Sequence, residues 1–342
     1  MKIQELGEFG LIDKIKKNAG RYKGHPEIVI GIGDDCAAIR YPGGNCLLYT
    51  TDTLVENVHF SKSYFTYYDI GFKALAVNLS DIAAMGGIPQ YCLVTLGITD
   101  GTGVKDVEEI YRGLKTIASE FDVKIIGGDI VKSPCGLVVS VTLTGKTLSG
   151  NGIRRSGAKP GDTVFCTGNF GDSAAGFFAL NKKLAGWDEL KRRHTRPRPR
   201  VKEGLFIAKT GLANSMIDSS DGFDKSVRII CEESGVGCEI RLDKIPVSKT
   251  FENFSSGNRI DKNEYILSGG EEYELIFTAS TENSGVFNKR FYPVGKITAK
   301  KDIVYTGPEG AIRDIGSGGF DHFAAKSKGK PQIYGGKRQR RR

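Results

Sequence analysis

Seven aspartates are the residues of this sequence whose positions suggest chemistry. They are Asp34 and Asp35 in GIGDDCA, Asp52 in YTTDT, Asp81 in AVNLSDIAAMGG, Asp129 in IIGGD, and Asp218 and Asp221 in MIDSSDG. Each stands where we expect a strand to end or a helix turn to lie, and Gly or Ser neighbours leave the backbone open to a ligand. One such aspartate is more often a helix cap or an Asx-turn, but seven of them indicate a shared function.

Asp81 is the aspartate that local structure explains least. The run around it is mostly Ala, Val, Leu, Ile and Met, a composition that predicts a buried helix. A carboxylate there is costly unless a cation or several hydrogen-bond donors lie beside it. Convergent carboxylates without His or Cys suit a hard ion, and Mg²⁺ is the usual one where phosphates are bound. The set therefore predicts Mg²⁺-assisted phosphate chemistry, of which phosphoryl transfer is the best fit.

The familiar nucleotide-binding motifs are absent from the sequence. Gly145-Lys-Thr147 is preceded by serine at position 140, where a P-loop requires glycine. Gly31-Ile-Gly33 lacks the third glycine of a dinucleotide fingerprint, and neither a nucleophile elbow nor a kinase catalytic loop occurs. We therefore expect phosphate to be held by metal, by Gly-rich backbone such as Gly127-Gly128, and by a cation such as Arg155.

The elements that must position these residues alternate between strands and helices. Apolar runs predict strands at 27–33, 46–51, 91–98, 123–126, 137–143, 163–167, 215–218, 238–242, 273–279 and 292–297. Helical spacing predicts helices at 70–85, capped by Asp69, and at 104–121, 173–184, 201–212 and 223–234. The turn cluster at 157–161 indicates a domain boundary near 150–160, which gives two α+β or α/β domains with mixed sheets. The Pro-rich segment 194–200 is expected to be an extended, solvated basic connector.

Composition limits the remaining classes of function. Residues 326–342 carry eight basic and no acidic residues, so the rest of the chain has a net charge of only +1 out of +9. We expect this tail to be disordered, and we expect no nucleic-acid partner beyond a weak contact by the tail. Seven cysteines without a Cys-x-x-Cys pair and four isolated histidines argue against disulfides and zinc. No membrane span or signal peptide is recognisable, which predicts a cytoplasmic protein.

The motifs resemble those of the thiamine-monophosphate kinase family, which shares a superfamily with aminoimidazole ribonucleotide synthetase and selenophosphate synthetase. The resemblance covers residues 3 to 325 and includes, in order, GEFGLI, TTDTLVENVHF, KALAVNLSDIAAMGG, RRSGAKPGD, GDSAAG, RPRPR, SGGEEYEL and FDHFA. It implies ATP-dependent phosphorylation of thiamine monophosphate to thiamine diphosphate with Mg²⁺. Because the sequence shows an acidic cluster and no positioned covalent nucleophile, we expect the transfer to be direct. The resemblance also implies a homodimer, in which an N-terminal ATP- and Mg²⁺-binding domain (1–150) pairs its mixed sheet with that of its mate. A C-terminal α/β sandwich (151–325) and the tail (326–342) complete the implied organisation.

The same resemblance implies roles for individual residues. It gives the Mg²⁺ ligands as Asp35, Thr50, Thr51, Asp52, Asp81, Asp129, Asp218 and Asp221, of which Asp129 and Asp221 are expected to be the most critical. It gives ATP contacts at Gly128, Asp129, Arg155 and Ser220, and contacts to the thiamine portion at His59, Glu271 and Phe320. Asp34 is interpreted as a cap beside the metal position. One departure from the family pattern is Glu272, where aspartate is common, and it concerns the geometry beside Glu271.

Two alternatives remain open on the sequence alone. A related ATP-dependent synthetase of the superfamily would share the Asp and Gly elements, although TTDTLVENVHF together with SGGEEYEL is not expected there. A non-catalytic polyanion-binding protein would work through the basic tail, and its function would disappear if residues 326–342 were deleted.

Overall fold

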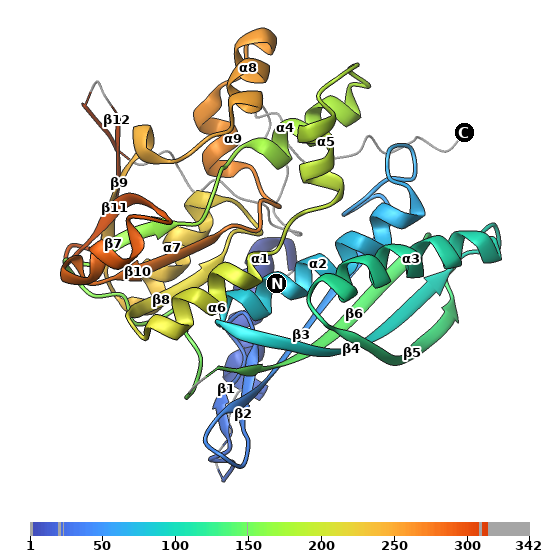
Figure 1. The fold of residues 1–342 in the computed structure, drawn as a ribbon, viewed down its shortest axis with the longest axis horizontal. Helices are drawn as coiled ribbons and strands as arrows, with labels where there is room; N and C mark the ends of the chain where they lie inside the picture. The colour runs from blue at the N-terminus through green and yellow to red at the C-terminus, as the bar shows by residue number, and fades with distance from the viewer. Residues whose placement is uncertain (1–2, 20–21, 23, 149, 308–309, 314–342) are drawn as a thin grey trace.

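Two mixed β-sheets divide the chain, as the computed structural model shows for residues 3–19, 22, 24–148, 150–307 and 310–313 (Figure 1). The six-stranded sheet has the order β1-β2-β3-β6-β4-β5, and the seven-stranded sheet has the order β13-β12-β9-β11-β7-β10-β8. Each sheet contains one parallel pair among antiparallel ones, β4 with β5 and β9 with β12. The expected pair of domains with mixed sheets is therefore confirmed, and the chain crosses between the sheets within the stretch that holds the turn cluster.

The strands of the first sheet are β1 (Ile28–Ile30), β2 (Ala37–Arg40), β3 (Cys46–Val55), β4 (Gly87–Ile98), β5 (Lys124–Lys132) and β6 (Val138–Thr147). Those of the second are β7 (Thr163–Cys166), β8 (Ala213–Asp218), β9 (Gly237–Arg241), β10 (Leu275–Ala279), β11 (Tyr292–Thr298), β12 (Ile303–Gly307) and β13 (Gly310–Arg313). The α-helices are α1 (Ile3–Ala19), α2 (Tyr67–Ala84), α3 (Val104–Glu120), α4 (Asp172–Asn181), α5 (Asp188–Thr195), α6 (Val201–Thr210), α7 (Phe223–Ser234), α8 (Lys249–Asn258), α9 (Lys262–Ser268) and α10 (Ser284–Phe287). Among these described helices, none is both long and apolar enough to cross a membrane.

Helix α2 is the central element of the N-terminal domain. The prediction that Asp69 is its N-cap is wrong, because Thr66 occupies that position and Asp69 completes a capping box from inside the first turn. With α3 it lies over one face of the six-stranded sheet (Figure 1). A side chain at Gly71 would meet the backbone oxygen of Ile110 at 1.9 Å, so glycine lets the two helices touch. Since α2 is buried on nearly every side, any charge on it needs a partner.

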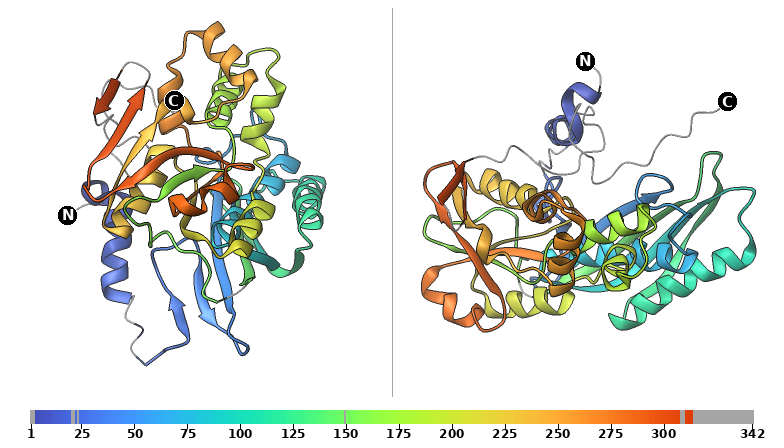
Figure 2. Two further views of the ribbon diagram at one scale, coloured as in Figure 1. Left: turned by 60° about the vertical axis from the view of Figure 1, so that its left-hand side comes forward. Right: turned by 90° about the horizontal axis from the view of Figure 1, so that it is seen from above.

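The other face of the six-stranded sheet exposes apolar side chains. Along β4, Cys92, Val94 and Leu96 point toward the helices, whereas Tyr91 and Leu93 are 46% and 45% exposed. Figure 2 shows the two domains as adjoining lobes, with the strands of this sheet forming one side of the N-terminal lobe. On the edge strand β5, Ile126 and Ile130 are also exposed, although Ile130 pairs with Leu96 and therefore points to the helix side of the sheet.

The prediction that Asp52 and Asp129 begin loops is wrong. Asp52 lies inside β3 and Asp129 lies inside β5, because both strands continue several residues beyond their apolar runs. The pairing of β3 with β6 and of β5 with β4 supplies backbone hydrogen bonds that composition does not reveal.

The prediction of a solvated basic connector at 194–200 is also wrong. Its first two residues end helix α5, and only 196–200 lie outside a helix. The three arginines there bind acids on α2, on α3 and just before β10: Arg196 with Asp69, Arg198 with Glu120, and Arg200 with Glu274. Arg196 and Arg198 also lie over the rings of Tyr68 and Phe72 of α2. The segment therefore fastens the C-terminal domain to α2 and α3.

Two of these ion pairs differ in burial, which predicts different contributions to the free energy of unfolding. Arg200 binds both oxygens of Glu274, whose side chain is 3% exposed, so Arg200→Ala leaves a buried carboxylate unpaired and should cost about 3 kcal/mol. Arg198 and Glu120 are 55% and 37% exposed, so Arg198→Ala should cost less than about 1 kcal/mol. Urea unfolding followed by circular dichroism measures both, and equal losses would contradict this ranking.

Candidate active site

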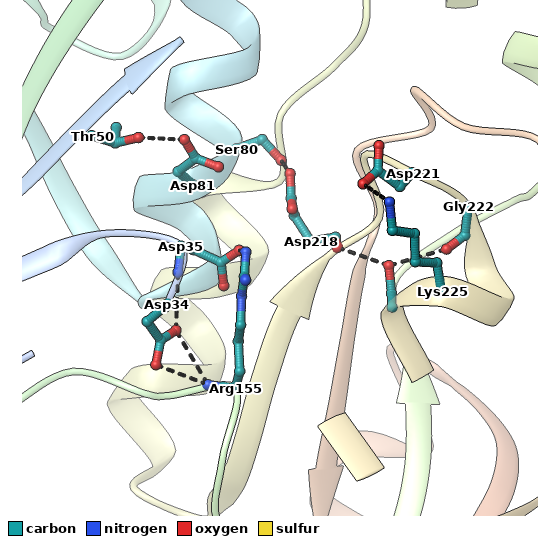
Figure 3. Close-up of polar contacts among 11 residues, drawn as sticks. Asp34, Asp35, Thr50, Ser80, Asp81, Arg155, Asp218, Asp221, Gly222 and Lys225 are labelled. Atoms are coloured by element: carbon teal, nitrogen blue, oxygen red, sulfur yellow. Dashed lines mark hydrogen bonds and ion pairs between the residues drawn. The ribbon is translucent and has the colours of Figure 1, made fainter. Parts of the chain in front are cut away.

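Three carboxylates meet where the two domains adjoin (Figure 3). Asp35 lies between β1 and β2, Asp81 lies in the last turn of α2, and Asp218 ends β8. Each offers one oxygen, and the three oxygens lie within 4.8 Å of one another. Because two residues come from the N-terminal domain and one from the C-terminal domain, the cluster requires both.

Polar neighbours fix the orientation of each carboxylate. Thr50 donates to Oδ2 of Asp81 at 2.5 Å, and Ser80 donates to Oδ2 of Asp218 at 2.6 Å. Nη2 of Arg155 donates to Oδ1 of Asp35 at 2.6 Å. The other oxygen, Oδ2 of Asp35, is buried without a hydrogen-bond partner among the residues that the structure describes. A buried acceptor left in this state needs a ligand, and a cation satisfies it.

The raised pKa values of the clustered carboxylates also indicate a bound cation. Burial and the charge of Asp35 raise the pKa of Asp218 to about 8. Burial, Asp221 and Asp35 raise the pKa of Asp52 to about 6. The pKa of Asp81 is raised well above its ordinary value, first by burial and then by Asp52 and Asp218. Like charges this close are stable together only with added positive charge, so the set fits a divalent cation.

Two cationic side chains and one cap complete this end of the site. Lys225 of α7 lies 2.8 Å from Oδ2 of Asp221, and Figure 3 shows it on the C-terminal side of the cluster, opposite Arg155. Asp34 accepts the backbone N–H groups of Asp35 and Arg155, which agrees with the capping role predicted for it. Burial and Asp35 raise the pKa of Asp34 to about 6.

Thr51 and Asp129 are not brought beside the three carboxylates within one chain. The hydroxyl of Thr51 lies on the exposed face of the sheet, 3.1 Å from that of Thr142. Asp129 is exposed and pairs across the sheet with Thr95, which shares that face. Gly128 beside it has a packing reason, since a side chain there would meet the oxygen of Val94 at 1.8 Å.

The residues expected to contact the thiamine portion lie near one another, apart from Phe320, which is outside the described residues. The backbone N–H of Glu271 donates to the oxygen of Ser220 at 2.6 Å, which ties its loop to the loop carrying Asp218 and Asp221. Lys73 connects Glu271 with His59, because its ammonium lies 2.6 Å from Oε1 of Glu271 and donates to the backbone oxygen of His59. Glu272, the departure from the family pattern, accepts the N–H groups of Gly171 and Ser173 and so caps α4.

Sequence patterns did not identify four polar residues of this region: Lys73, Ser80, His194 and Lys225. For Lys73 a signal exists, since it lies in the same apolar run as Asp81 and the argument about a buried charge applies equally to it. Lys225 stands four residues after Asp221, a spacing that could also have indicated it, whereas Ser80 and His194 are placed by tertiary contacts.

Comparison with known proteins gives the family. Residues 33–147 match the family model of the AIR synthase related protein N-terminal domain, and residues 159–307 match that of its C-terminal domain. The chain is 38% identical to the thiamine-monophosphate kinase of Aquifex aeolicus over 84% of this chain and 90% of that protein. It is 36% identical to that of Bacillus subtilis over 93% of this chain and the whole of the relative.

A solved structure agrees with these relatives. The structure described as "AaThiL complexed with AMPPCP and TMP" has a TM-score of 0.84 to this chain at 34% identity, and covers 94% of this chain and 99% of its own. Because such relatives match more than four fifths of its length, the chain belongs to the thiamine-monophosphate kinase family.

Proposed function

We propose that this protein phosphorylates thiamine monophosphate to thiamine diphosphate with ATP and Mg²⁺. The observation that carries the proposal is the convergence of Asp35, Asp81 and Asp218 between the domains, in a chain whose relatives are thiamine-monophosphate kinases. The relative solved with AMPPCP and TMP supports ATP and thiamine monophosphate as the two substrates.

The donor set supports Mg²⁺ as the metal. It consists of oxygen ligands, and Oδ2 of Asp35 is a buried acceptor to which none of the described residues donates. We propose Asp35, Thr50, Asp52, Asp81, Asp218 and Asp221 as the residues that hold Mg²⁺ within one chain. When bound, Mg²⁺ neutralises phosphate oxygens and aligns the acceptor with the γ-phosphate.

The side chains of this chain then act mainly by holding the two phosphates in line. Arg155 and Lys225 place a guanidinium and an ammonium beside the carboxylates, where each can turn to a phosphate oxygen. The attacking group is the phosphate of thiamine monophosphate, whose second pKa of about 6 leaves it largely ionised near neutral pH. No side-chain base is needed, and the transfer is direct.

The organic substrate and the nucleotide bind around this centre. We propose that Gly128, Arg155 and Ser220 contact ATP, and that His59, Glu271 and Phe320 contact the thiamine portion. Domain 1–150 then supplies most of the ligands to ATP and Mg²⁺, domain 151–325 adds the loops of Asp218 and Glu271, and 326–342 is an accessory tail.

One assay tests the function. Purified protein with ATP, Mg²⁺ and thiamine monophosphate should form thiamine diphosphate and ADP in equal amounts, followed by chromatography. Protein lacking residues 326–342 should keep this turnover. Unaltered thiamine monophosphate with folded, metal-replete protein would overturn the proposal, and loss of turnover with the tail would favour a tail-borne function.

We also propose that the protein is a homodimer paired through the exposed face and edge of the six-stranded sheet. Strand β5 is an edge strand with Ile126 and Ile130 about 60% exposed, and an uncovered apolar edge of this kind favours pairing with another chain. Sedimentation should give twice the chain mass, and Ile130→Lys should shift the protein toward monomer.

Asp129 lies on this face, and its proposed role as a metal or ATP ligand therefore depends on the pairing. Asp129→Asn should lower kcat by about a hundredfold without changing the free energy of unfolding of the monomer. Steady-state kinetics on the folded variant measures this, and wild-type kcat would remove Asp129 from the proposed ligands.

A reducing compartment is the setting that we propose for this activity. All seven cysteines are free thiols and six of them are buried, as is usual for proteins kept in the cytoplasm.

A further inference from the structure

Lys73 is a charged residue buried in the middle of α2. Its side chain is 0% exposed, and its ammonium lies 2.6 Å from Oε1 of Glu271. It also donates to the backbone oxygen of His59 at 3.3 Å and lies 5.3 Å from the ring centre of Phe65. Burying an ammonium costs free energy, so we expect the Lys73–Glu271 ion pair to have a role beyond packing.

Glu271 is held from two sides. Its backbone has φ of 62°, a left-handed conformation that is uncommon for a side chain of this kind, and its N–H donates to Ser220. Oε1 faces Lys73, whereas Oε2 is buried and makes no hydrogen bond within the described part of the chain. Nδ1 of His194 is 3.2 Å from Oε2, and burial and Lys73 hold the pKa of His194 well below its ordinary value, so the ring is neutral.

Aromatic rings border the same place. The rings of Phe177, Phe65 and Tyr64 lie 5.3, 5.6 and 6.4 Å from that of His194, between ring centres. Burial and then the charge of Glu271 raise the pKa of Tyr64 to about 12. An acceptor oxygen beside flat apolar surfaces suits an aromatic ring that carries an N–H donor.

The Lys73–Glu271 pair changes what Glu271 can offer a substrate. The ammonium and the carboxylate cancel in charge, so Glu271 has little net attraction for a cationic thiazolium. Nδ1 of His194 lies 3.2 Å from Oε2 but makes no hydrogen bond to it, so Oε2 has no donor among the described residues, and an amino group on a pyrimidine supplies one. Recognition here is therefore by a hydrogen bond of fixed direction more than by charge.

We propose that Lys73 is a positioning residue that fixes Glu271 so that its Oε2 accepts an N–H of the aminopyrimidine of thiamine monophosphate. The inference rests on the proposed contact of Glu271 with the thiamine portion. Lys73 does not touch the substrate, and it acts only through Glu271.

A double-mutant cycle tests this. Variants Lys73→Met, Glu271→Gln and the double variant are compared by the Kd of thiamine monophosphate from titration calorimetry, and by kcat and both KM values. Each single variant should raise the Kd and KM for thiamine monophosphate by about tenfold, while KM for ATP changes less than about twofold. The double variant should be no weaker than Glu271→Gln alone, because Lys73 has no role once Glu271 is changed.

A control variant and a second comparison distinguish a role of Lys73 in binding from a role in folding alone. Lys62→Met removes a neighbouring Lys–Glu pair, 3.1 Å from Glu56, and should leave the Kd unchanged. If Lys73→Met does not fold, the double variant, in which both charges are removed, is compared with Glu271→Gln. A double variant tenfold weaker than Glu271→Gln, an unchanged Kd in either single variant, or an equal rise of both KM values overturns the inference. Wild-type protein that forms no thiamine diphosphate would instead overturn the proposed function.

Discussion

Replacing Asp81 by asparagine is expected to lower kcat about a thousandfold, which corresponds to about 4 kcal/mol of lost transition-state stabilisation. Asp81 shares its oxygen site with Asp35 and Asp218, and the substitution removes one negative charge while leaving an oxygen that can accept the hydrogen bond from Thr50. Because asparagine keeps the shape of the site, the loss of kcat measures the effect of removing the negative charge. Steady-state kinetics at saturating ATP and thiamine monophosphate measures it.

The same variant should be more stable than the wild type without metal. Burial and neighbouring acids raise the pKa of Asp81, so its ionised form destabilises the fold, and the neutral amide does not. Thermal unfolding in a chelator should show a higher Tm for Asp81→Asn, and added Mg²⁺ should raise it less than in the wild type.

Asp261→Asn is the matched control for this prediction. Asp261 caps α9 by accepting the N–H of Asn263 and Glu264, and asparagine caps a helix equally well. This variant should keep wild-type kcat and the full Mg²⁺ response. Near-wild-type turnover of Asp81→Asn, or an undiminished response to Mg²⁺, would contradict the assignment of the cluster.

Helices with strong end signals could be predicted from the sequence. The pattern at 104–121 corresponds to α3 (Val104–Glu120), and the pattern at 223–234 corresponds to α7 (Phe223–Ser234), since Gly103 or Gly222 precedes each and amphipathic spacing continues throughout. The helices α1, α8 and α9 and the outer strands β12 and β13 were not predicted. The segments of α8, α9, β12 and β13 are short, and α1 is interrupted by the non-helical backbone of Gly7.

The face to which a strand residue points could not be predicted, because it depends on where the strand ends. Thr51 and Asp52 are neighbours, and the sequence placed the end of the strand between them, so both could turn toward a metal. Since β3 continues to Val55, the two side chains point to opposite faces, Asp52 toward Asp221 and Asp35 and Thr51 toward Thr142. The same alternation of side chains along β5 places Asp129 on the face of the sheet opposite the cluster.

Asp81 of α2 was identified from the cost of a buried charge, but Lys73 of the same helix was not. The cost of a buried charge singled out Asp81, and the structure places it with two other carboxylates. Lys73 meets the same criterion eight residues earlier, but its partner Glu271 lies in a loop about two hundred residues away in sequence. A buried ion pair between distant segments has no local signature.

The stability of the metal-free protein is expected to fall as pH rises from about 4 to about 9, by an amount on the order of 9 kcal/mol. The pKa of Asp52 is raised from 3.8 to about 6, and that of Asp218 is raised from 3.8 to about 8. Within this range the folded protein binds more protons than the unfolded chain, so the free energy of unfolding decreases with pH. The contribution is fully present below about pH 4, and it is lost through the two raised pKa values in turn.

Mg²⁺ should reverse this slope, because it binds the ionised carboxylates that the high pH creates. Added Mg²⁺ should raise Tm little at about pH 5 and by several degrees at about pH 8, where Asp52 is ionised and Asp218 is close to half ionised. Urea unfolding across this range, with chelator or with Mg²⁺, measures both slopes. Asp218→Asn should flatten the metal-free slope between about pH 6 and 9, since the carboxyl with the higher pKa is gone. An Mg²⁺ stabilisation that is equal at both pH values would mean that the ion binds elsewhere than at these carboxylates.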